Sequence, residues 1–526
     1  MPDRSGDPGT RYHLIRYVGL AGAVALAVAA SLGGALPEPP AAGWAVFTSG
    51  TGVLSVLAWA AGTGAMVWAW WSARHGVPSV RWASTTVGLW ALPLLVAPPL
   101  GSRDVYSYAC QGWILRDGGD PYSGVAGQGC PWVEAVAPLW RDTPAPYGPL
   151  FVWLAGLAVA VGAGLTGTLL ALRLTAVAGL VLVAVALPGL AARCGLPAGR
   201  ALWLTVGCPV VLIHLVSGAH NDALMVGLLV AALWVITAGS ARQSGGGTGR
   251  AGAGTGGVGG ASVAAVAGGL LLGLAVAVKA TALVVVPFAA VLAVAGPRRP
   301  AALVRAGAPV VAGVVGAVAA TTALSGLGLG WVAGLARSGD SRQWTSPPTA
   351  VGLLIDYLGR LVGVRLDAVG AVRVVGLALL AGFLVWLWWR VWRGGGPLTG
   401  WRGPDGRAVP AEPAGRASSV AKSAGAPATW DRGTVVFGAG LALAATVLAA
   451  PVVYPWYLSW PLALLAAAAY RTGWFLLPVA VAGFLVLPDG SGVAALTKAP
   501  GTVAMCALIV VLVVRAVRSV QRSGAR

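Results

Sequence analysis

Long apolar segments run through most of this chain of 526 residues and constrain its fold more than any other feature. Hydrophobic residues make up 57% of the sequence and charged residues only 10%, whereas soluble domains carry about 25% charged residues. A soluble protein with so little charge could not cover its surface with polar groups. Because a membrane-spanning helix needs about 20 mostly apolar residues, the sequence predicts an all-α polytopic membrane protein.

The apolar segments predict about 13 to 15 transmembrane helices. Fourteen spans are predicted at 14–36, 46–71, 84–100, 168–190, 201–217, 222–238, 261–278, 280–296, 303–325, 368–391, 433–453, 457–470, 473–488 and 500–518. One further apolar piece, residues 149–164, is too short to cross a bilayer easily. We interpret it as a re-entrant or membrane-surface segment.

Basic residues give the predicted orientation, because cytoplasmic loops carry an excess of Lys and Arg. With 149–164 not crossing, the cytoplasmic side holds 24 of the 35 basic and 5 of the 16 acidic residues, leaving 11 of each outside. The whole net charge of +19 then lies on one side. We therefore expect a multi-pass plasma-membrane protein with both termini cytoplasmic and residues 101–148 outside, and no nucleic-acid partner.

Two low-complexity stretches divide the chain. Residues 239–260 are Gly-rich and residues 394–432 are rich in Gly, Pro, Ala and Arg, so both are predicted to be cytoplasmic linkers, the second disordered. The predicted organisation is N-terminal transmembrane helices over 1–83, a membrane core over 84–393, the disordered loop 394–432, and C-terminal transmembrane helices over 433–526.

Charged residues near membrane depth are functional hypotheses by default, because burying them in lipid is costly. Asp104 follows the predicted span 84–100 by four residues. A positioned carboxylate there could act as a general base. The alternative is that Arg103 and Asp104 cap the next helix and face water.

Two further candidates lie at predicted outer ends of spans. The turn His220-Asn221-Asp222 could face the same cavity as Asp104, or Asn221 or Asp222 could cap the helix that follows. Two close ligands are a weak metal signal, since catalytic zinc usually takes three protein ligands, and no metal is predicted. Lys279 lies between two apolar runs, where it could bind a phosphate as a point charge or snorkel to the lipid head groups.

The remaining candidates belong to outer loops. Arg337 and Arg342 could meet an anionic lipid head, and Trp456 could stack on a sugar or anchor an aromatic belt. Cys110 and Cys130 lie on the oxidising side and could form a disulfide. That bridge would close a loop of about 20 residues and stabilise it by about 3 kcal/mol in the chain-entropy model. No motif supports nucleotide binding.

Several of these motifs together resemble the actinobacterial polyprenol-phosphomannose-dependent α-1,6-mannopyranosyltransferases, which belong to the GT-C class of membrane glycosyltransferases. The resemblance rests on the order and spacing of Ser102-Arg103-Asp104-Val105-Tyr106-Ser107-Tyr108, Asp120-Pro121-Tyr122, Pro146-Tyr147-Gly148-Pro149-Leu150, His220-Asn221-Asp222-Ala223-Leu224 and Lys279-Ala280-Thr281 with Pro287. It covers about residues 80 to 465.

The resemblance implies a GT-C-like core with a large first extracytoplasmic loop carrying short helices. It implies a polyprenyl-phosphate mannose donor, a lipid-anchored mannan acceptor of the lipomannan or lipoarabinomannan type, and no further cofactor. It also implies that Asp104 is the catalytic carboxylate of the first outer loop. Donor-phosphate candidates are Lys279, Arg337 and Arg342. Substrate-binding candidates are Arg103, Tyr106, Tyr108, Asp120, Tyr122, Tyr147, His220, Asn221, Asp222 and Trp456.

This chemistry is a single inversion at the anomeric carbon, which needs a base on the acceptor hydroxyl and stabilisation of the departing phosphate. Three alternatives stay open. A related transferase could use another polyprenyl-phosphate sugar, such as glucose or arabinofuranose. A transporter or lipid flippase would place charges near the midplane and often shows inverted repeats, and neither is evident here. A non-catalytic assembly partner would lack the loop acid, and Asp104 is present.

Overall fold

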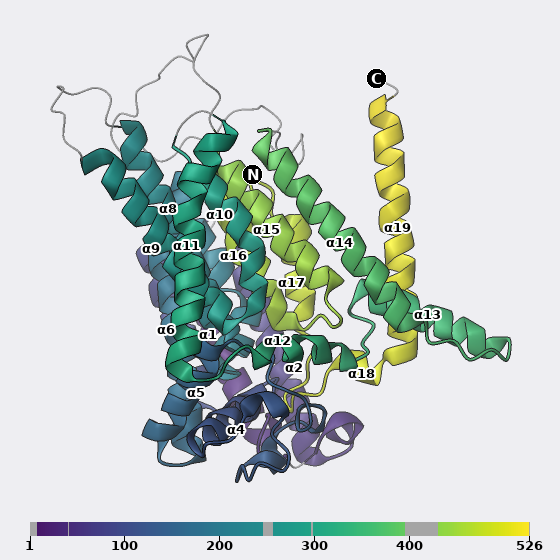
Figure 1. Cartoon of the computed structure of the whole chain (residues 1–526). Helices are drawn as coiled ribbons and strands as arrows, with labels where there is room; N and C mark the ends of the chain where they lie inside the picture. The colour runs from purple at the N-terminus through teal and green to yellow at the C-terminus, as the bar shows by residue number, and fades with distance from the viewer. Residues whose placement is uncertain (1–7, 40, 246–255, 296–297, 395–429, 525–526) are drawn as a thin grey trace, which may run out of the picture.

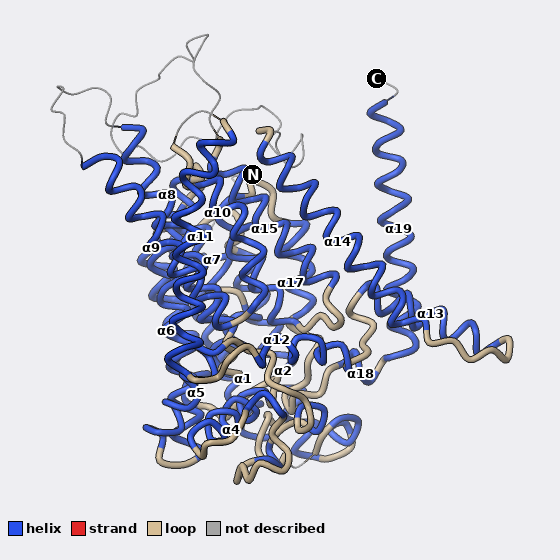
Figure 2. Tube along the Cα trace, viewed as in Figure 1, coloured by secondary structure: helices blue, strands red, loops and turns tan. Residues whose placement is uncertain are grey.

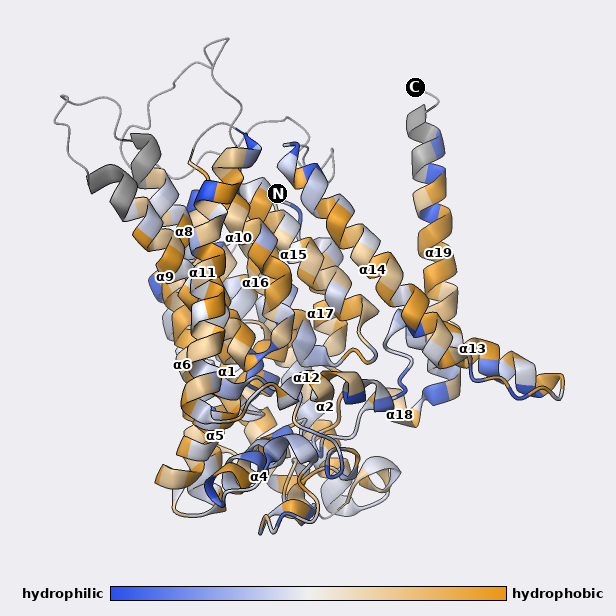
Figure 3. Cartoon of the chain, viewed as in Figure 1, coloured by the Kyte–Doolittle hydropathy of each residue, from blue (hydrophilic) through white to orange (hydrophobic). Residues whose placement is uncertain are grey.

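The computed structural model describes residues 8–39, 41–245, 256–295, 298–394 and 430–524. These residues form an all-helical bundle in which no strand occurs in the described ranges (Figure 2). The predicted loop 394–432 therefore lies almost entirely outside the described residues. Hydrophobic residues predominate along the helices of the bundle (Figure 3), as expected for membrane-spanning segments.

Nine helices in the described part of the chain are long and apolar enough to cross a membrane. They are α1 (Pro8–Gly33), α2 (Gly50–Ser72), α6 (Leu165–Arg193), α8 (Asp222–Gly245), α9 (Gly256–Val278), α11 (Pro300–Ser325), α14 (Ala368–Trp392), α15 (Arg432–Ala449) and α19 (Lys498–Gly524). A tenth span is possible if α7 (Ala198–Val206) and η5 (Val211–Ser217), which meet at a bend of 63°, are counted as one. The polytopic class is thus confirmed.

The described part of the chain contains nine helices of spanning length, or ten with the bent pair, compared with the 13 to 15 spans predicted. Four predicted spans are short helices or helix pairs: α3 (Val80–Val96), η6 (Ala280–Val285) with α10 (Val286–Leu292), η8 (Pro455–Leu458) with α16 (Ser459–Ala468), and α17 (Gly473–Ala482). At 1.5 Å per residue these are shorter than the roughly 30 Å hydrocarbon core. In α16 every residue is buried, so its apolar sequence serves packing inside the bundle.

Helix α5 (Pro149–Gly162) packs against α4 (Asp104–Arg116) and α6 at one end of the bundle (Figure 1). A side chain at Gly112 would overlap the backbone of Ala155, so this glycine permits the close approach of α4 and α5. The segment 149–164 thus stays at the end that carries α4, and its helix of 14 residues is shorter than the candidate spans.

The predicted linker 239–260 is shorter in the structure. Helix α8 continues to Gly245 and α9 begins at Gly256, and residues 246–255 lie outside the described part. Gly239 packs against Ala264 of α9, so this glycine serves close helix contact rather than ending α8. Composition alone could not distinguish a glycine in a flexible linker from a glycine that permits close helix contact.

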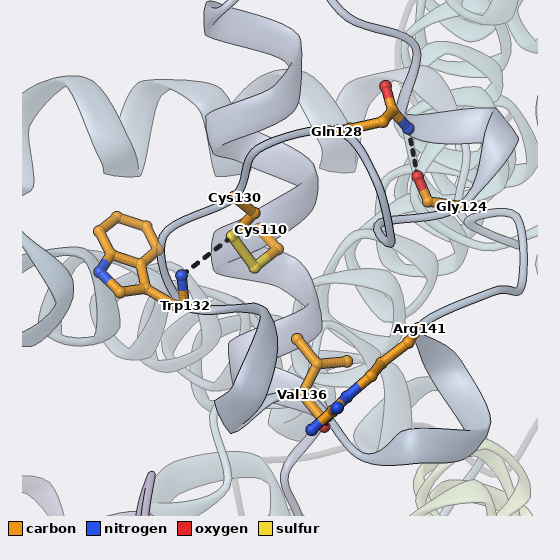
Figure 4. Close-up of a disulfide and its surroundings, with 7 residues drawn as sticks. All are labelled: Cys110, Gly124, Gln128, Cys130, Trp132, Val136 and Arg141. Atoms are coloured by element: carbon orange, nitrogen blue, oxygen red, sulfur yellow. Dashed lines mark hydrogen bonds between the residues drawn. A yellow bond between two sulfur atoms is a disulfide. The ribbon is translucent and has the colours of Figure 1, made fainter.

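The loop 101–148 contains α4 and three short 3-10 helices, η2 (Pro121–Ser123), η3 (Val133–Ala135) and η4 (Pro138–Trp140). A disulfide between Cys110 and Cys130 ties α4 to this loop (Figure 4). Nearby, Gln128 donates a hydrogen bond to the carbonyl of Gly124, and Arg141 donates one to Val136 at 3.2 Å. The loop is therefore a folded cap on this end of the bundle.

Three further α-helices, α12 (Gly330–Arg337), α13 (Pro347–Leu361) and α18 (Val493–Leu496), and two 3-10 helices, η1 (Gly43–Phe47) and η7 (Ser338–Asp340), complete the described part of the chain. Helix α12 lies near the α4 end, α14 packs against α15, and α19 stands apart from the main bundle (Figure 1). Arg373 of α14 donates hydrogen bonds to the carbonyls of Ser341 at 2.6 Å and Pro451 at 3.0 Å. This cation fixes the segment before α13 and the segment after α15 against α14.

Candidate active site between two cavities

Asp104 is the first residue of α4, and the segment before it is fixed by hydrogen bonds. The Asp104 backbone N–H donates to Ser102 Oγ at 3.1 Å. Arg103 donates to the carbonyls of Pro37 at 2.9 Å and Ala135 at 2.8 Å. The N-cap is Arg103, whose side chain makes no capping hydrogen bond. The Asp104 carboxylate is therefore not used as a cap and lines a cavity instead.

The environment of Asp104 makes its carboxylate more basic. Burial raises the pKa of Asp104 to about 6, and the nearby Asp222 carboxylate contributes in the same direction. The Lys279 ammonium and hydrogen bonds from the Ser102 and Trp140 side chains oppose this rise in the pKa. Asp104 lies in the loop at the end of the bundle, outside the candidate spans. A carboxylate with a pKa near 6 is ionised at neutral pH and suited to accept a proton.

His220 lies between two carboxylates. Its Nδ1 atom is 3.8 Å from Asp104 Oδ2 and 3.9 Å from Asp222 Oδ2, too far for a direct hydrogen bond to either. The imidazole stacks on Trp456 with ring centroids 4.1 Å apart. Its Nδ1 is also 3.4 Å from the Tyr108 hydroxyl. The turn 220–222 is thus held by aromatic packing and placed beside Asp104.

Asp222 and Lys279 form a buried ion pair. Lys279 Nζ lies 2.8 Å from Asp222 Oδ1, and the indole N–H of Trp460 donates to the same oxygen. The ammonium group also lies 4.7 Å from the ring centroid of Tyr457 and 4.9 Å from that of Trp460. These contacts hold the lysine head group within the protein, so the snorkelling alternative does not describe its position.

Gly148 explains how Tyr147 reaches this ion pair. Its N–H donates to Val278 O at 3.1 Å, and a side chain at Gly148 would overlap the backbone of Ala277. Only glycine permits this close approach to the end of α9. The Tyr147 ring is consequently 5.8 Å from Lys279 Nζ and packs edge-on against Tyr108 at 5.2 Å.

Two neighbouring cavities meet at these residues. The first, called the polar cavity, is lined by Asp104, Ser107, Gln111, Trp140, Arg337 and Tyr454, among others. The second, called the apolar cavity, is lined by Lys279, Leu335, Leu377, Leu380, Ala449 and Trp460, among others. Tyr147, Tyr457, Pro146 and Val452 line both. A reaction could therefore join groups entering from the two sides.

Several predicted residues, Arg103, Tyr106, Asp120, Tyr122 and Arg342, neither belong to the ion pair nor line either cavity. Arg342 pairs with Asp367 at 3.0 Å on the surface. Asp120 accepts a hydrogen bond from the Tyr122 N–H at 2.9 Å, and Tyr122 OH donates to Tyr147 O at 3.2 Å. Tyr106 OH donates to Ala35 O at 2.7 Å. These groups, with Arg103, hold the loop in place around the site. Arg337 lines the polar cavity and pairs with Asp340 at 2.8 Å.

Asn221 is buried, and neither polar atom of its side chain has a hydrogen-bond partner in the described residues. Those residues contain no group of three or more His, Cys, Asp or Glu side chains that could hold a metal ion. Sequence reasoning missed Trp460, Trp140, Ser107 and Gln111. A usable signal for Trp460 was its position three residues after Tyr457, which places both rings on one helical face.

Comparisons with known proteins give two family matches. The model described as "Alpha-(1->6)-mannopyranosyltransferase, N-terminal domain" matches residues 16–295. The model described as "MptB C-terminal domain" matches residues 427–518. The first match covers every residue from Asp104 to Lys279 in the site described above. No solved structure matches the chain significantly.

Curated proteins of the same description are similar along most of the chain. Alpha-(1->6)-mannopyranosyltransferase Rv1459c of Mycobacterium tuberculosis is 34% identical over 73% of this chain and 65% of its own length, just under two thirds of that relative. Alpha-(1->6)-mannopyranosyltransferase A of the same organism is 33% identical over 81% of this chain and 73% of its own length. Alpha-(1->6)-mannopyranosyltransferase B of Corynebacterium glutamicum is 27% identical over 91% and 77%.

Proposed function

Because the chain belongs to the alpha-(1->6)-mannopyranosyltransferase family, we propose that it transfers mannose from polyprenyl-phosphate mannose to a lipid-anchored α-1,6-mannan acceptor of the lipomannan or lipoarabinomannan type. The relatives' names support mannosyl transfer. The donor, the acceptor and the residue roles are our proposal, and the arrangement of the two cavities supports them.

In this mechanism Asp104 is the general base. It takes the proton from the acceptor 6-hydroxyl, whose oxygen attacks the anomeric carbon of the donor mannose. The bond from that carbon to the phosphate oxygen breaks, and polyprenyl phosphate leaves as an anion. One displacement converts a β-linked donor into an α-linked product, so the enzyme is inverting. Placement of Asp104 in the polar cavity supports this role, because a mannan is a polar ligand.

The apolar cavity would hold the donor. Lys279 provides a cation for the phosphate, and developing charge on the leaving group is the kind that a preorganised cation stabilises. Leu377 and Leu380 of α14 line the same cavity. Leu377 is 52% exposed, so the cavity reaches the lateral surface of the bundle, where a polyprenyl chain in the membrane could enter.

The reaction is proposed to occur on the extracytoplasmic face, with both termini in the cytoplasm. Arg298 donates a hydrogen bond to the Arg393 carbonyl at 3.0 Å, and Arg200 donates one to the Tyr470 carbonyl at 3.1 Å. The charge distribution assigns these four residues to cytoplasmic loops or to the cytoplasmic ends of helices. The described ends of α8 and α14 lie opposite α4 (Figure 1). This arrangement supports placing α4 and Asp104 outside.

One observation carries the proposal: Asp104 and Lys279 line adjoining cavities, with His220 lying between Asp104 and the Asp222 carboxylate that pairs with Lys279. The test is a membrane assay with radiolabelled polyprenyl-phosphate mannose and a synthetic α-mannoside acceptor. We expect a labelled product that α-1,6-specific mannosidase digestion converts to free mannose. No transfer from this donor, with transfer from polyprenyl-phosphate glucose or arabinofuranose, would overturn the sugar assignment. No transfer from any of the three would overturn the proposed activity.

A further inference from the structure

The polar cavity contains two buried polar groups that the proposed mechanism does not use. Ser107 Oγ and Gln111 Oε1 have no hydrogen-bond partner in the described residues. Their residues are only 4% and 5% exposed. Leaving such groups unsatisfied costs about 1–3 kcal/mol each, so their positions call for an explanation. Both residues line the cavity that contains Asp104.

Helix periodicity places these groups in a row. Asp104, Ser107 and Gln111 are separated by three and four residues on α4, and such positions share one face of a helix. With a rise of 1.5 Å per residue, Gln111 lies about 10 Å along α4 from Asp104. That distance is comparable with the length of a disaccharide. Buried side-chain amides and hydroxyls that face a cavity are suited to bind sugar hydroxyls, which both donate and accept hydrogen bonds.

We propose that this face of α4 binds the acceptor over two sugar residues, with Gln111 bonded to hydroxyls of the second mannose from the reacting end. Ser107 binds the first mannose beside Asp104. This inference rests on the proposed function, since it takes Asp104 as the point of attack. It adds that the enzyme recognises an acceptor of at least two linked sugars and not a single mannose.

The backbone of α4 on both sides of Gln111 is held in place, and this supports the assignment. Cys110, one residue before Gln111, is bonded to Cys130, and Gly112, one residue after it, packs closely against α5. The backbone at Gln111 is thus fixed on both sides. A hydrogen-bonding side chain on a fixed backbone binds a ligand at a lower cost in conformational entropy than one on a mobile backbone. A neutral hydrogen bond contributes about 0.5–1.5 kcal/mol, or roughly a 3- to 10-fold effect on affinity.

The experiment compares an α-mannoside with an α-1,6-mannobioside carrying the same aglycone. In purified wild-type protein we expect tighter binding of the mannobioside by isothermal titration calorimetry without donor, and a higher kcat/KM for it with donor. Gln111→Leu should lower the mannobioside-to-mannoside ratio roughly 3- to 10-fold, through KM and not kcat. Gln111→Met, which keeps the side chain's length, should act the same way. Gln521→Leu, a change at an exposed glutamine near the end of α19, is the matched control and should leave the ratio unchanged.

The binding arm separates this inference from the proposed function, because it needs no donor. Binding of the mannobioside without mannosyl transfer would reject the proposed function and support the acceptor site. Equal binding of the two acceptors by the wild type, or an unchanged ratio in both Gln111 variants, would overturn the inference while leaving mannosyl transfer intact. A variant that binds neither acceptor is checked by circular dichroism, and the other Gln111 variant then decides.

Discussion

Lys279 places its ammonium nitrogen 2.8 Å from the buried carboxylate of Asp222, and Trp460 donates a hydrogen bond to the same oxygen. The Asp222 side chain is fully buried and the Lys279 side chain is 11% exposed. Asp222 therefore fixes a cation whose remaining accessible surface is in the apolar cavity. In the proposed mechanism this pair positions the charge that binds the donor phosphate.

Substitutions at this ion pair should show whether Lys279 binds the donor phosphate or only neutralises the Asp222 carboxylate. Lys279→Met alone leaves a buried carboxylate unpaired, which costs about 3–5 kcal/mol of stability. The double variant Lys279→Met/Asp222→Asn removes both charges and should fold. We expect its KM for the polyprenyl-phosphate donor to rise roughly 10- to 150-fold, the effect of losing a charge-assisted hydrogen bond.

Lys498→Met, at an exposed lysine at the start of α19, is the matched control for steady-state kinetics of the double variant. If the double variant kept wild-type donor KM and turnover, Lys279 would serve only to neutralise Asp222.

The pH dependence should report the titration of Asp104. Its pKa is raised to about 6 by burial, and a general base works only when deprotonated. The kcat/KM for the acceptor should therefore fall about tenfold per pH unit below pH 6 and level off above it. The measurement is a kcat/KM profile from pH 4.5 to 8.5.

His220 lies 3.8 Å from Asp104, but burial and the nearby His214 and Lys279 lower the pKa of its imidazole well below the usual value. The fall in kcat/KM below pH 6 should persist in His220→Gln and be absent from the residual activity of Asp104→Asn. If only His220→Gln abolished this fall, the titrating group would be the imidazole.

The proposed orientation predicts which loops an impermeant thiol reagent reaches. In a variant with the three free cysteines replaced by Ser, we expect Asp117→Cys at the end of α4 to be labelled on intact cells. His75→Cys, in the exposed turn after α2, should be labelled only after permeabilisation. Both residues are exposed. The reverse pattern would place Asp104 on the cytoplasmic side.

The disulfide should stabilise the loop that presents Asp104. Its two cysteines are 20 residues apart, and closing a loop of that size stabilises by about 3 kcal/mol in the chain-entropy model. The double change Cys110→Ser/Cys130→Ser should therefore speed proteolysis within 117–145 and lower turnover. Cys506→Ser, at a free cysteine in α19, should change neither. Equal proteolysis rates would mean that helix packing alone fixes the loop.

The convergence of Asp104, the 220–222 turn and Lys279 could be predicted because each lies at the end of an apolar segment and charge asymmetry assigned those ends to one side. The sequence could not show how they meet. The ion pair joins residues 57 positions apart, and Trp460 comes from α16, which lies in the segment 457–470 that the hydropathy pattern predicted to be a span.

Other differences come from surface loops and from packing inside the bundle. Arg342 and Asp120 have the residue types of phosphate and sugar ligands, yet one pairs with Asp367 and the other holds the Tyr122 N–H. Residue type alone cannot distinguish these uses. The excess of predicted spans has a similar cause, because a short helix buried by other helices is as apolar as a short span facing lipid.

The central claim is that Asp104 is the base. Its most direct test is the single-turnover rate of Asp104→Asn with saturating polyprenyl-phosphate mannose and acceptor, compared with Asp117→Asn, an exposed aspartate at the other end of α4. General-base catalysis contributes about 10²–10⁴-fold, so the Asp104→Asn rate should fall by that factor with donor affinity little changed, while Asp117→Asn stays near wild type. A near-normal rate for folded, membrane-inserted Asp104→Asn would contradict the account.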